Sequence, residues 1–280
     1  MSSFLKSFRE ITKYPSAVAG LLIISILVGI SIVAPVVMPY SEAILLWRGG
    51  VGVWEDNPRL APPTWTNLFR QVDLPATIVL NSIQLDDERV IKTVETTSAG
   101  KSITIDFMFD YQYDGFPQEI VLLFTSEYVQ KSPFVGLTWV KPDGEEVNLG
   151  NFSLKPTQAF YASQDDRLKR RLGGFNPQEG LFMDLTVDPP VAAAMRGTYQ
   201  LRIDGVAFEE DSDFDVKVVM YGQVHGIAGT DHLRRDLSVA LLWGTPIALG
   251  FGLLAALVRS LTTMIIGVLG TWFGGGVDML

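Results

Sequence analysis

The chain has 280 residues, a net charge of −9, two histidines and no cysteine. The negative charge argues against a nucleic-acid-binding protein, because contact with phosphates requires a basic surface. Without cysteine, disulfide frameworks and thiolate metal sites are excluded. The mean hydropathy is +0.24 although 19% of the residues are charged, and this combination indicates separate apolar and polar regions.

The first apolar region is residues 17–38, which contain no charged side chain. A helix of that length rises about 33 Å, enough to cross a hydrocarbon core of about 30 Å. A cleaved signal peptide has a shorter apolar stretch and a small-residue cleavage site, so we interpret this run as a retained transmembrane helix. Lys6, Arg9 and Lys13 precede it, and positive flanks stay in the cytoplasm. Residues 1–16 are therefore predicted to be cytoplasmic and the chain after the helix extracytoplasmic.

Residues 40–228 carry 27 acidic and 16 basic side chains, and therefore a net charge of −11. In SITIDFMFDYQYD, residues 102–114, aromatic residues alternate with mostly acidic ones, which predicts a strand with one aromatic face. The segment KPDGEEV indicates a hairpin turn, and residues 197–208 and 214–224 are typical of a closing strand pair. Short strands at this spacing predict an all-β domain, a sandwich or jelly-roll-like fold.

Two stretches of this region lack the strand pattern. Residues 41–75 are rich in Pro, Gly and Trp, and we expect an irregular lead-in there. Residues 156–180 interrupt the sheet, and we expect one short helix among them.

The second apolar region is residues 237–273, in which Arg259 is the only charged residue. One helix of that length would rise about 55 Å, more than a perpendicular span needs. Thr245 can cap a helix, and Pro246 suits a first helical turn. The sequence therefore predicts a short interfacial helix over DLSVALLW, residues 236–243, a break at WGTP, and a transmembrane helix over residues 246–272.

A polar segment, GTDHLRRDL, lies directly before this apolar region. It shares the pattern GTDxxGRD through Gly229, Thr230, Asp231, Arg235 and Asp236. A second pattern, GYxGGxxD, is matched after the apolar region by Trp272, Phe273, Gly274, Gly275 and Asp278, with Gly244 and Gly252 matching glycines in between. In these features the chain resembles the C-type permease subunit of dipeptide, oligopeptide and nickel ABC importers.

The chain departs from that family in several ways. Arg234 stands where the family has the glycine of GRD, which suggests that this position accepts a side chain and tolerates substitution. Ala240 and Pro246 replace arginines of the family pattern. The family's outer loop is short, whereas residues 40–228 are inserted here. Its later spans and the cytoplasmic EAA-type loop that meets the ATPase do not follow, so we expect a fragment or a split permease.

Together these features predict a mixed membrane protein in which two transmembrane α-helices flank an extracytoplasmic β domain. Residues 229–245 are expected at the membrane interface and residues 273–280 in the cytoplasm. The resemblance implies a non-enzymatic permease subunit in the cell membrane that forms part of a path for peptides or similar small solutes. It implies a second permease subunit, separate cytoplasmic ATPase subunits and an extracytoplasmic solute-binding protein as partners. An alternative hypothesis is a membrane-anchored binding or assembly protein whose outer β domain docks a partner.

The motif residues have a physical interpretation of their own. Gly229 and Thr230 can bend and cap the chain, and Asp231 suits the N-terminus of a helix that begins there. Arg235 and Asp236 can pair locally or bind lipid headgroups. We interpret them as a clamp at the membrane interface rather than as a substrate contact.

The remaining polar residues give few signals. Arg259 either faces the translocation path or an acid of a partner subunit, or the span ends near Val258 and its side chain reaches the cytoplasm. His225 and His232 lack a surrounding ligand cluster, so no metal site is predicted, and no catalytic or cofactor-binding pattern is found. The acidic run 209–215 could hold calcium, but we interpret it as a solvated loop.

Overall fold

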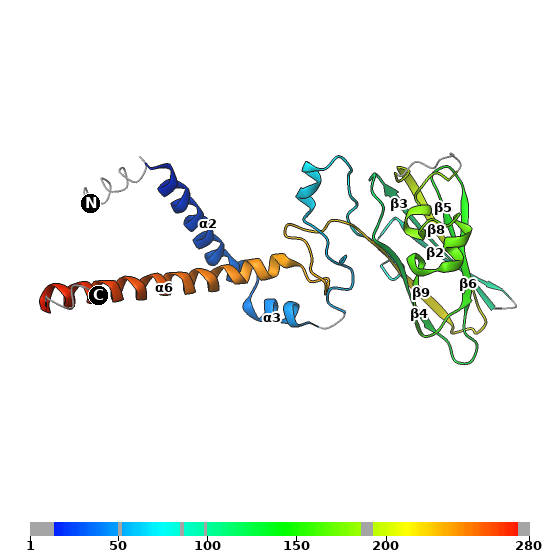
Figure 1. The fold of residues 1–280 in the computed structure, drawn as a ribbon. Coiled ribbons are helices and arrows are strands. Elements are labelled where there is room, and N and C mark those ends of the chain that lie inside the picture. Colours follow the sequence, from blue (N-terminus) through cyan, green and yellow to red (C-terminus); the bar gives the residue numbers. More distant parts are fainter. Residues whose placement is uncertain (1–13, 50–51, 85–86, 98–99, 186–192, 274–280) are drawn as a thin grey trace. The chain divides into compact units, whose positions relative to one another are not determined.

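The structure is a computed structural model that describes residues 14–49, 52–84, 87–97, 100–185 and 193–273. The chain divides into two compact units. The helical unit combines residues 1–53 with residues 237–280, and the β-unit is Trp54–Asp236. Figure 1 shows their helices and strands.

The helical unit contains α2 (Pro15–Val37), α3 (Tyr40–Arg48) and α6 (Leu237–Phe273). Both α2 and α6 are long and apolar enough to cross a membrane, although α6 contains the charged residue Arg259. Most of their large apolar side chains are exposed. The expectation of two long apolar helices on either side of a β domain in the sequence is confirmed.

An irregular lead-in was expected over residues 41–75, but the first part of that stretch forms helix α3. Glu42 lies in the first turn of α3 and Arg48 in the last, an arrangement of charge that favours a helix. The Trp243 ring of α6 packs against Tyr40 with ring centroids 4.9 Å apart. The same indole donates a hydrogen bond to the carbonyl of Met38, 3.1 Å away. These contacts fix the junction of α2 and α3 against α6.

The predicted break in the second apolar region is wrong, because α6 continues through Pro246 as one helix of 37 residues. The Thr245 hydroxyl does not cap a new helix; it donates to the carbonyl of Leu241 at 2.7 Å. A proline removes one backbone donor from a helix. Helix α6 nevertheless continues on both sides of Pro246.

The β-unit is a sandwich of two antiparallel sheets, as the sequence predicted. The four-stranded sheet has the order β1-β9-β4-β7 and the five-stranded sheet the order β2-β3-β8-β5-β6. The strands are β1 (Ile78–Asn81), β2 (Val90–Thr97), β3 (Gly100–Tyr111), β4 (Glu119–Glu127), β5 (Phe134–Val140), β6 (Glu146–Ser153), β7 (Thr157–Tyr161), β8 (Gly197–Ala207) and β9 (Asp213–Tyr221).

The aromatic face predicted from alternation is buried between the sheets. Phe107, Phe109 and Tyr111 of β3 are each at most 3% exposed. Trp139 of β5 and Tyr199 of β8 pack around Phe109, with ring centroids 5.6 and 5.7 Å from it. This aromatic cluster forms the centre of the core, and a period of two in the sequence is sufficient to place it.

The predicted pairing of the last two strands is wrong. Strand β8 lies between β3 and β5, whereas β9 lies between β1 and β4 in the other sheet. The connection after Ala207 therefore crosses from one sheet to the other. By contrast, the predicted hairpin turn joins β5 and β6, closed by a hydrogen bond from Lys141 N–H to the Glu145 carbonyl at 2.9 Å.

The interruption after β6 holds more than one short helix. It contains β7, η2 (Ala162–Gln164), α4 (Asp166–Arg171) and α5 (Pro177–Gly180). Asp165 begins α4 by accepting hydrogen bonds from two backbone N–H groups of its first turn. Phe182, which follows α5, is fully buried and packs on Tyr199, with ring centroids 4.9 Å apart. The insertion therefore adds to the core.

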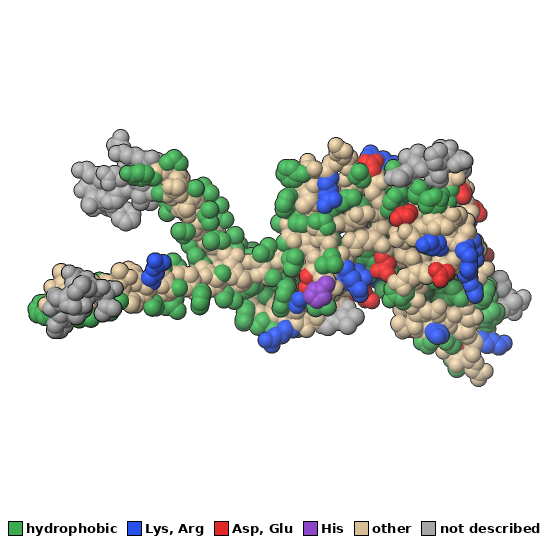
Figure 2. Space-filling view, in the orientation of Figure 1, with side chains coloured by type: hydrophobic (Ala, Val, Ile, Leu, Met, Phe, Trp, Pro, Cys, Tyr) green, Lys and Arg blue, Asp and Glu red, His purple; other side chains and the backbone are tan. Residues whose placement is uncertain are grey.

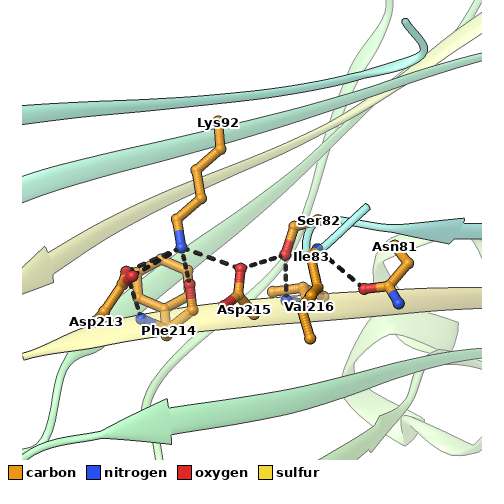
Figure 3. Close-up of polar contacts among 8 residues, drawn as sticks. All are labelled: Asn81, Ser82, Ile83, Lys92, Asp213, Phe214, Asp215 and Val216. Carbon is orange, nitrogen blue, oxygen red and sulfur yellow. Dashed lines mark hydrogen bonds and ion pairs between the residues drawn. The ribbon is translucent and has the colours of Figure 1, made fainter. Parts of the chain in front are cut away.

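The two sheets are tied together by Lys92 of β2, whose side chain is 12% exposed (Figure 3). Its ammonium group lies 3.0 Å from carboxylate oxygens of both Asp213 and Asp215 on β9. It also donates to the Phe214 carbonyl at 2.9 Å. Asp215 in turn accepts a hydrogen bond from Ser82 at 2.7 Å. Because β2 and β9 belong to different sheets, this network links the two layers.

We predict that Lys92→Met lowers the free energy of unfolding of the β-unit by about 1–3 kcal/mol, since it leaves two neighbouring carboxylates without their cation. The control is Lys155→Met, because Lys155 is an exposed lysine of the same unit. Denaturant unfolding of the full chain in detergent measures the unfolding midpoint of each variant. Equal midpoints for the two variants would contradict the proposed tie between the sheets.

Candidate functional site

The candidate site is the GTD segment, residues 229–236, which closes the β-unit directly before α6. Gly229 has φ +78°, and a Cβ there would overlap the carbonyl of Ala61. Thr230 is 4% exposed. Its hydroxyl accepts from the Ala61 N–H at 3.0 Å and donates to the Pro58 carbonyl at 2.8 Å. The first two motif residues thus fasten the segment to the chain that leads into the sandwich.

Asp231 organises the rest of the segment. One carboxylate oxygen accepts backbone N–H bonds from Leu233 at 2.8 Å and Arg235 at 2.9 Å. The other lies 2.8 Å from Nε and 2.6 Å from Nη2 of Arg235. Burial opposes charge on this carboxyl, but the hydrogen bonds from Arg235 and Leu233 outweigh it and lower the pKa of Asp231.

The turn at Asp231 confirms one sequence expectation and corrects another. The expected local pairing of Arg235 is confirmed, with Asp231 as its partner. The expectation that a helix begins at Asp231 is wrong, because α6 begins at Leu237. Asp231 instead satisfies N–H groups of a tight turn, as aspartate does in Asx turns. An antiparallel bridge between Thr230 and Asp236 closes that turn.

Arg234 is the residue whose importance the sequence did not reveal. Its guanidinium lies over the ring of Tyr221, 3.9 Å from the centroid, in a cation–π arrangement. It donates to the Asn57 carbonyl at 2.5 Å and to a carboxylate oxygen of Glu119 at 3.3 Å. Burial raises the pKa of Tyr221 to about 12 despite the nearby cation. The expectation that position 234 tolerates substitution is not supported by these contacts.

The two histidines take different positions. His225 Nε2 lies 3.8 Å from a carboxylate oxygen of Asp236, whereas His232 is exposed. Within the described residues, no group of three or more His, Asp or Glu side chains is arranged to hold a metal ion.

Part of the acidic run, residues 209–215, makes structural contacts, while Glu210 and Asp211 are exposed. The Glu209 carboxylate accepts backbone N–H bonds from Val129, Gln130 and Lys131 at 2.6–2.8 Å. These hydrogen bonds, that of Val129 first, lower the pKa of Glu209. Further along the run, Asp213 and Asp215 bind Lys92.

Arg259 lies on α6, exposed, beside Ser260 and Thr263. It is 22 residues beyond Leu237, about 33 Å along the helix axis. Both sequence hypotheses for Arg259 stay open. The second family motif cannot be placed, because Gly274, Gly275 and Asp278 lie outside the described residues.

No family model and no curated protein matches the chain. One matching solved structure is that of TmCBM61 in complex with beta-1,4-galactotriose, with a TM-score of 0.24 and 9% identity over 59% of this chain and 95% of that chain. Another is the structure of the infectious bursal disease virus Gx strain, with a TM-score of 0.26 and 12% identity over 56% of this chain and 36% of that chain.

We predict that Gly229→Ala lowers the stability of the β-unit by about 2–4 kcal/mol, the sum of a left-handed backbone penalty and a steric overlap. Gly144→Ala is the matched control, because Gly144 has φ +88° but open space around its Cβ position. Gly144→Ala should lower the free energy of unfolding by only the left-handed backbone penalty of about 1–2 kcal/mol. Equal losses in thermal or denaturant unfolding would show that the close approach to Ala61 is not important.

The lowered pKa of Asp231 gives a pH prediction. A carboxyl with a lower pKa in the folded state than in the unfolded state stabilises the fold when it is ionised. This stabilisation is fully present at pH values above the ordinary pKa of 3.8, and it is lost as the pH falls through the lowered pKa of the folded state. Asp231→Asn should therefore be less stable than the parent at pH 7, by about 1–3 kcal/mol. The difference should shrink only below pH 3.8. Unfolding measured at several pH values tests this, and a difference that vanishes near pH 6 would contradict it.

Proposed function

We propose that this chain is a permease subunit of an ABC importer for peptides or similar small solutes. In this proposal α2 and α6 span the cell membrane, and the β-unit lies outside. The chain forms part of the translocation path together with a second permease subunit. Separate ATPase subunits drive transport, and a solute-binding protein delivers the solute.

The observation that carries the proposal is the backbone conformation of the GTD segment. The family motif has glycine at the positions of Gly229 and Arg234, and these residues have φ +78° and φ +66°. Glycine adopts this left-handed region without penalty, and other residues rarely do. At position 229 both the residue and its backbone conformation agree with the motif, whereas at position 234 only the backbone conformation does. This agreement supports the resemblance on grounds independent of composition.

The motif contacts support a role for the GTD segment as the clamp between outer domain and span. Asp231 and Arg235 form a closed turn, and Thr230 fastens that turn to Ala61. Leu237, the first residue of α6, follows directly. A rigid turn at that place would fix where the span begins. The N-terminal positive flank supports a cytoplasmic N-terminus.

A second candidate function is the docking of an extracytoplasmic partner by a membrane-anchored β-unit. An open groove of about 430 Å³ on the four-stranded sheet favours it. Leu123 and Thr125 of β4, Tyr161 of β7 and Lys217 of β9 are among its lining residues. Apolar and polar groups are mixed there, as in many binding sites.

Purification of the tagged full chain from its native membranes tests the permease proposal. We expect ATPase subunits and a second permease subunit to co-purify, and vanadate-sensitive ATP hydrolysis to accompany them. Arg235→Ala should reduce the yield of the complex, and Arg235→Lys should restore part of it, because lysine keeps the charge but not the two-pronged hydrogen bonding.

Arg89→Ala is the matched control, since Arg89 also pairs locally with an aspartate, Asp87, at 2.6 Å in the β-unit. It should leave the yield unchanged. A chain that purifies with extracytoplasmic partners but never with an ATPase would overturn the permease proposal and favour docking.

A further inference from the structure

The β-unit exposes a set of large apolar side chains on two loop segments, residues 60–69 and 227–233. We call this set the apolar rim. Its members, with their exposed fractions, are Leu60 (70%), Trp65 (52%), Leu68 (82%), Phe69 (82%), Ile227 (80%) and Leu233 (57%). Figure 2 shows apolar side chains at the surface where Figure 1 places the short η1 helix, Thr64–Phe69. Exposed apolar groups that gather in this way mark interaction surfaces.

The two segments of the rim are fastened to one another. The N–H of Leu60 donates to the Asp231 carbonyl at 3.1 Å. The indole N–H of Trp65 donates to the Ile227 carbonyl at 3.0 Å. The rings of Trp65 and Phe69 meet edge to face with centroids 6.3 Å apart. The rim is therefore a held surface and not a set of unrelated loop residues.

Leu60 of the rim has an unusual backbone conformation. Its φ is +50°, in the left-handed region, which costs a residue with a Cβ about 1–2 kcal/mol. Its side chain stays 70% exposed, so no burial within the chain offsets that cost. Backbone strain of this kind is found at binding surfaces.

The connectivity of the chain indicates which surface the rim meets. Asp231, the partner of Leu60, belongs to the GTD segment, and Asp236 at the end of that segment is covalently joined to the first residue of α6. The rim is thus hydrogen-bonded to the segment that leads covalently into α6. Arg59 and Arg70 flank η1 and are exposed. Tryptophan, phenylalanine and leucine next to arginine are typical of segments that enter a lipid interface.

We propose that the apolar rim inserts into the outer interfacial layer of the membrane that α6 spans, so that the β-unit holds the bilayer at a second place besides its helices. This inference rests on the proposed membrane embedding of α6. Trp65 and Phe69 supply the apolar contact, and the flanking arginines suit lipid phosphates.

Single-cysteine labelling tests the proposal, because the chain has no cysteine of its own. Separate variants place an environment-sensitive fluorophore at Phe69, Ile227, Val129 or Leu254. The full chain is reconstituted into phosphatidylcholine–phosphatidylglycerol vesicles. Quenching is then measured with nitroxide-bearing phospholipids and with aqueous iodide. Val129 is the control within the β-unit, since its exposed fraction of 83% matches that of Phe69.

We expect labels at positions 69 and 227 to be quenched by shallow lipid nitroxides and several-fold less by iodide than the label at position 129. Iodide access at 69 and 227 equal to that at 129 would overturn the inference. So would shielding from both quenchers, which would mean that a protein covers the rim. The label at Leu254 of α6 separates the two proposals. Lipid quenching at 254 alone rejects the rim contact but leaves the permease proposal standing, whereas no lipid quenching at 254 rejects membrane embedding itself.

Discussion

The closed turn made by Asp231 is the constraint on which the end of the β-unit depends. Its carboxylate holds two backbone N–H groups and the guanidinium of Arg235 within one short loop. Charge-assisted hydrogen bonds of this kind are about twice as strong as neutral ones. Thr230 then joins the turn to Ala61, more than 160 residues earlier in the chain. The two ends of the β-unit are thereby fixed to each other beside the residue where α6 begins.

The GTD segment also contacts the outer face of the four-stranded sheet. Val121, Val219 and Tyr221 form a small apolar cluster on that face, separate from the main core. Arg234 lies over Tyr221, whose hydroxyl donates to the Glu55 carbonyl at 2.6 Å. Residues of the lead-in and of the GTD segment therefore act as one cover. The guanidinium of Arg234, 3.9 Å from the ring centroid of Tyr221, is part of this cover.

Part of this architecture follows from local sequence pattern. The apolarity of α2 and α6 follows from their sequences, although the full length of α6 was missed because a break was expected before Pro246. Alternation places Phe107, Phe109 and Tyr111 in the core. The choice of sheet partner is not local. Strands β8 and β9 are separated by only five residues yet belong to different sheets. The short connection favours a hairpin, but each strand instead buries its apolar face between the two sheets from its own side.

The site was predictable to a similar extent. A local pairing of Arg235 was among the expectations, but the tight turn that brings Asp231 to it was not, because a helix was expected to begin at Asp231. The contacts of Arg234 with Asn57 and Glu119 join segments distant in sequence, and no local pattern reveals them.

Hydrogen exchange of the full chain in lipid nanodiscs tests the central claim, that the GTD segment is a locked turn fastened to the lead-in. The amides of Ala61, Thr230 and Arg235 are hydrogen-bonded in that turn. The account predicts that they exchange as slowly as the amides of the central strand β8. Exchange as fast as that of exposed loop amides would contradict it, because the turn would then open independently of the sandwich.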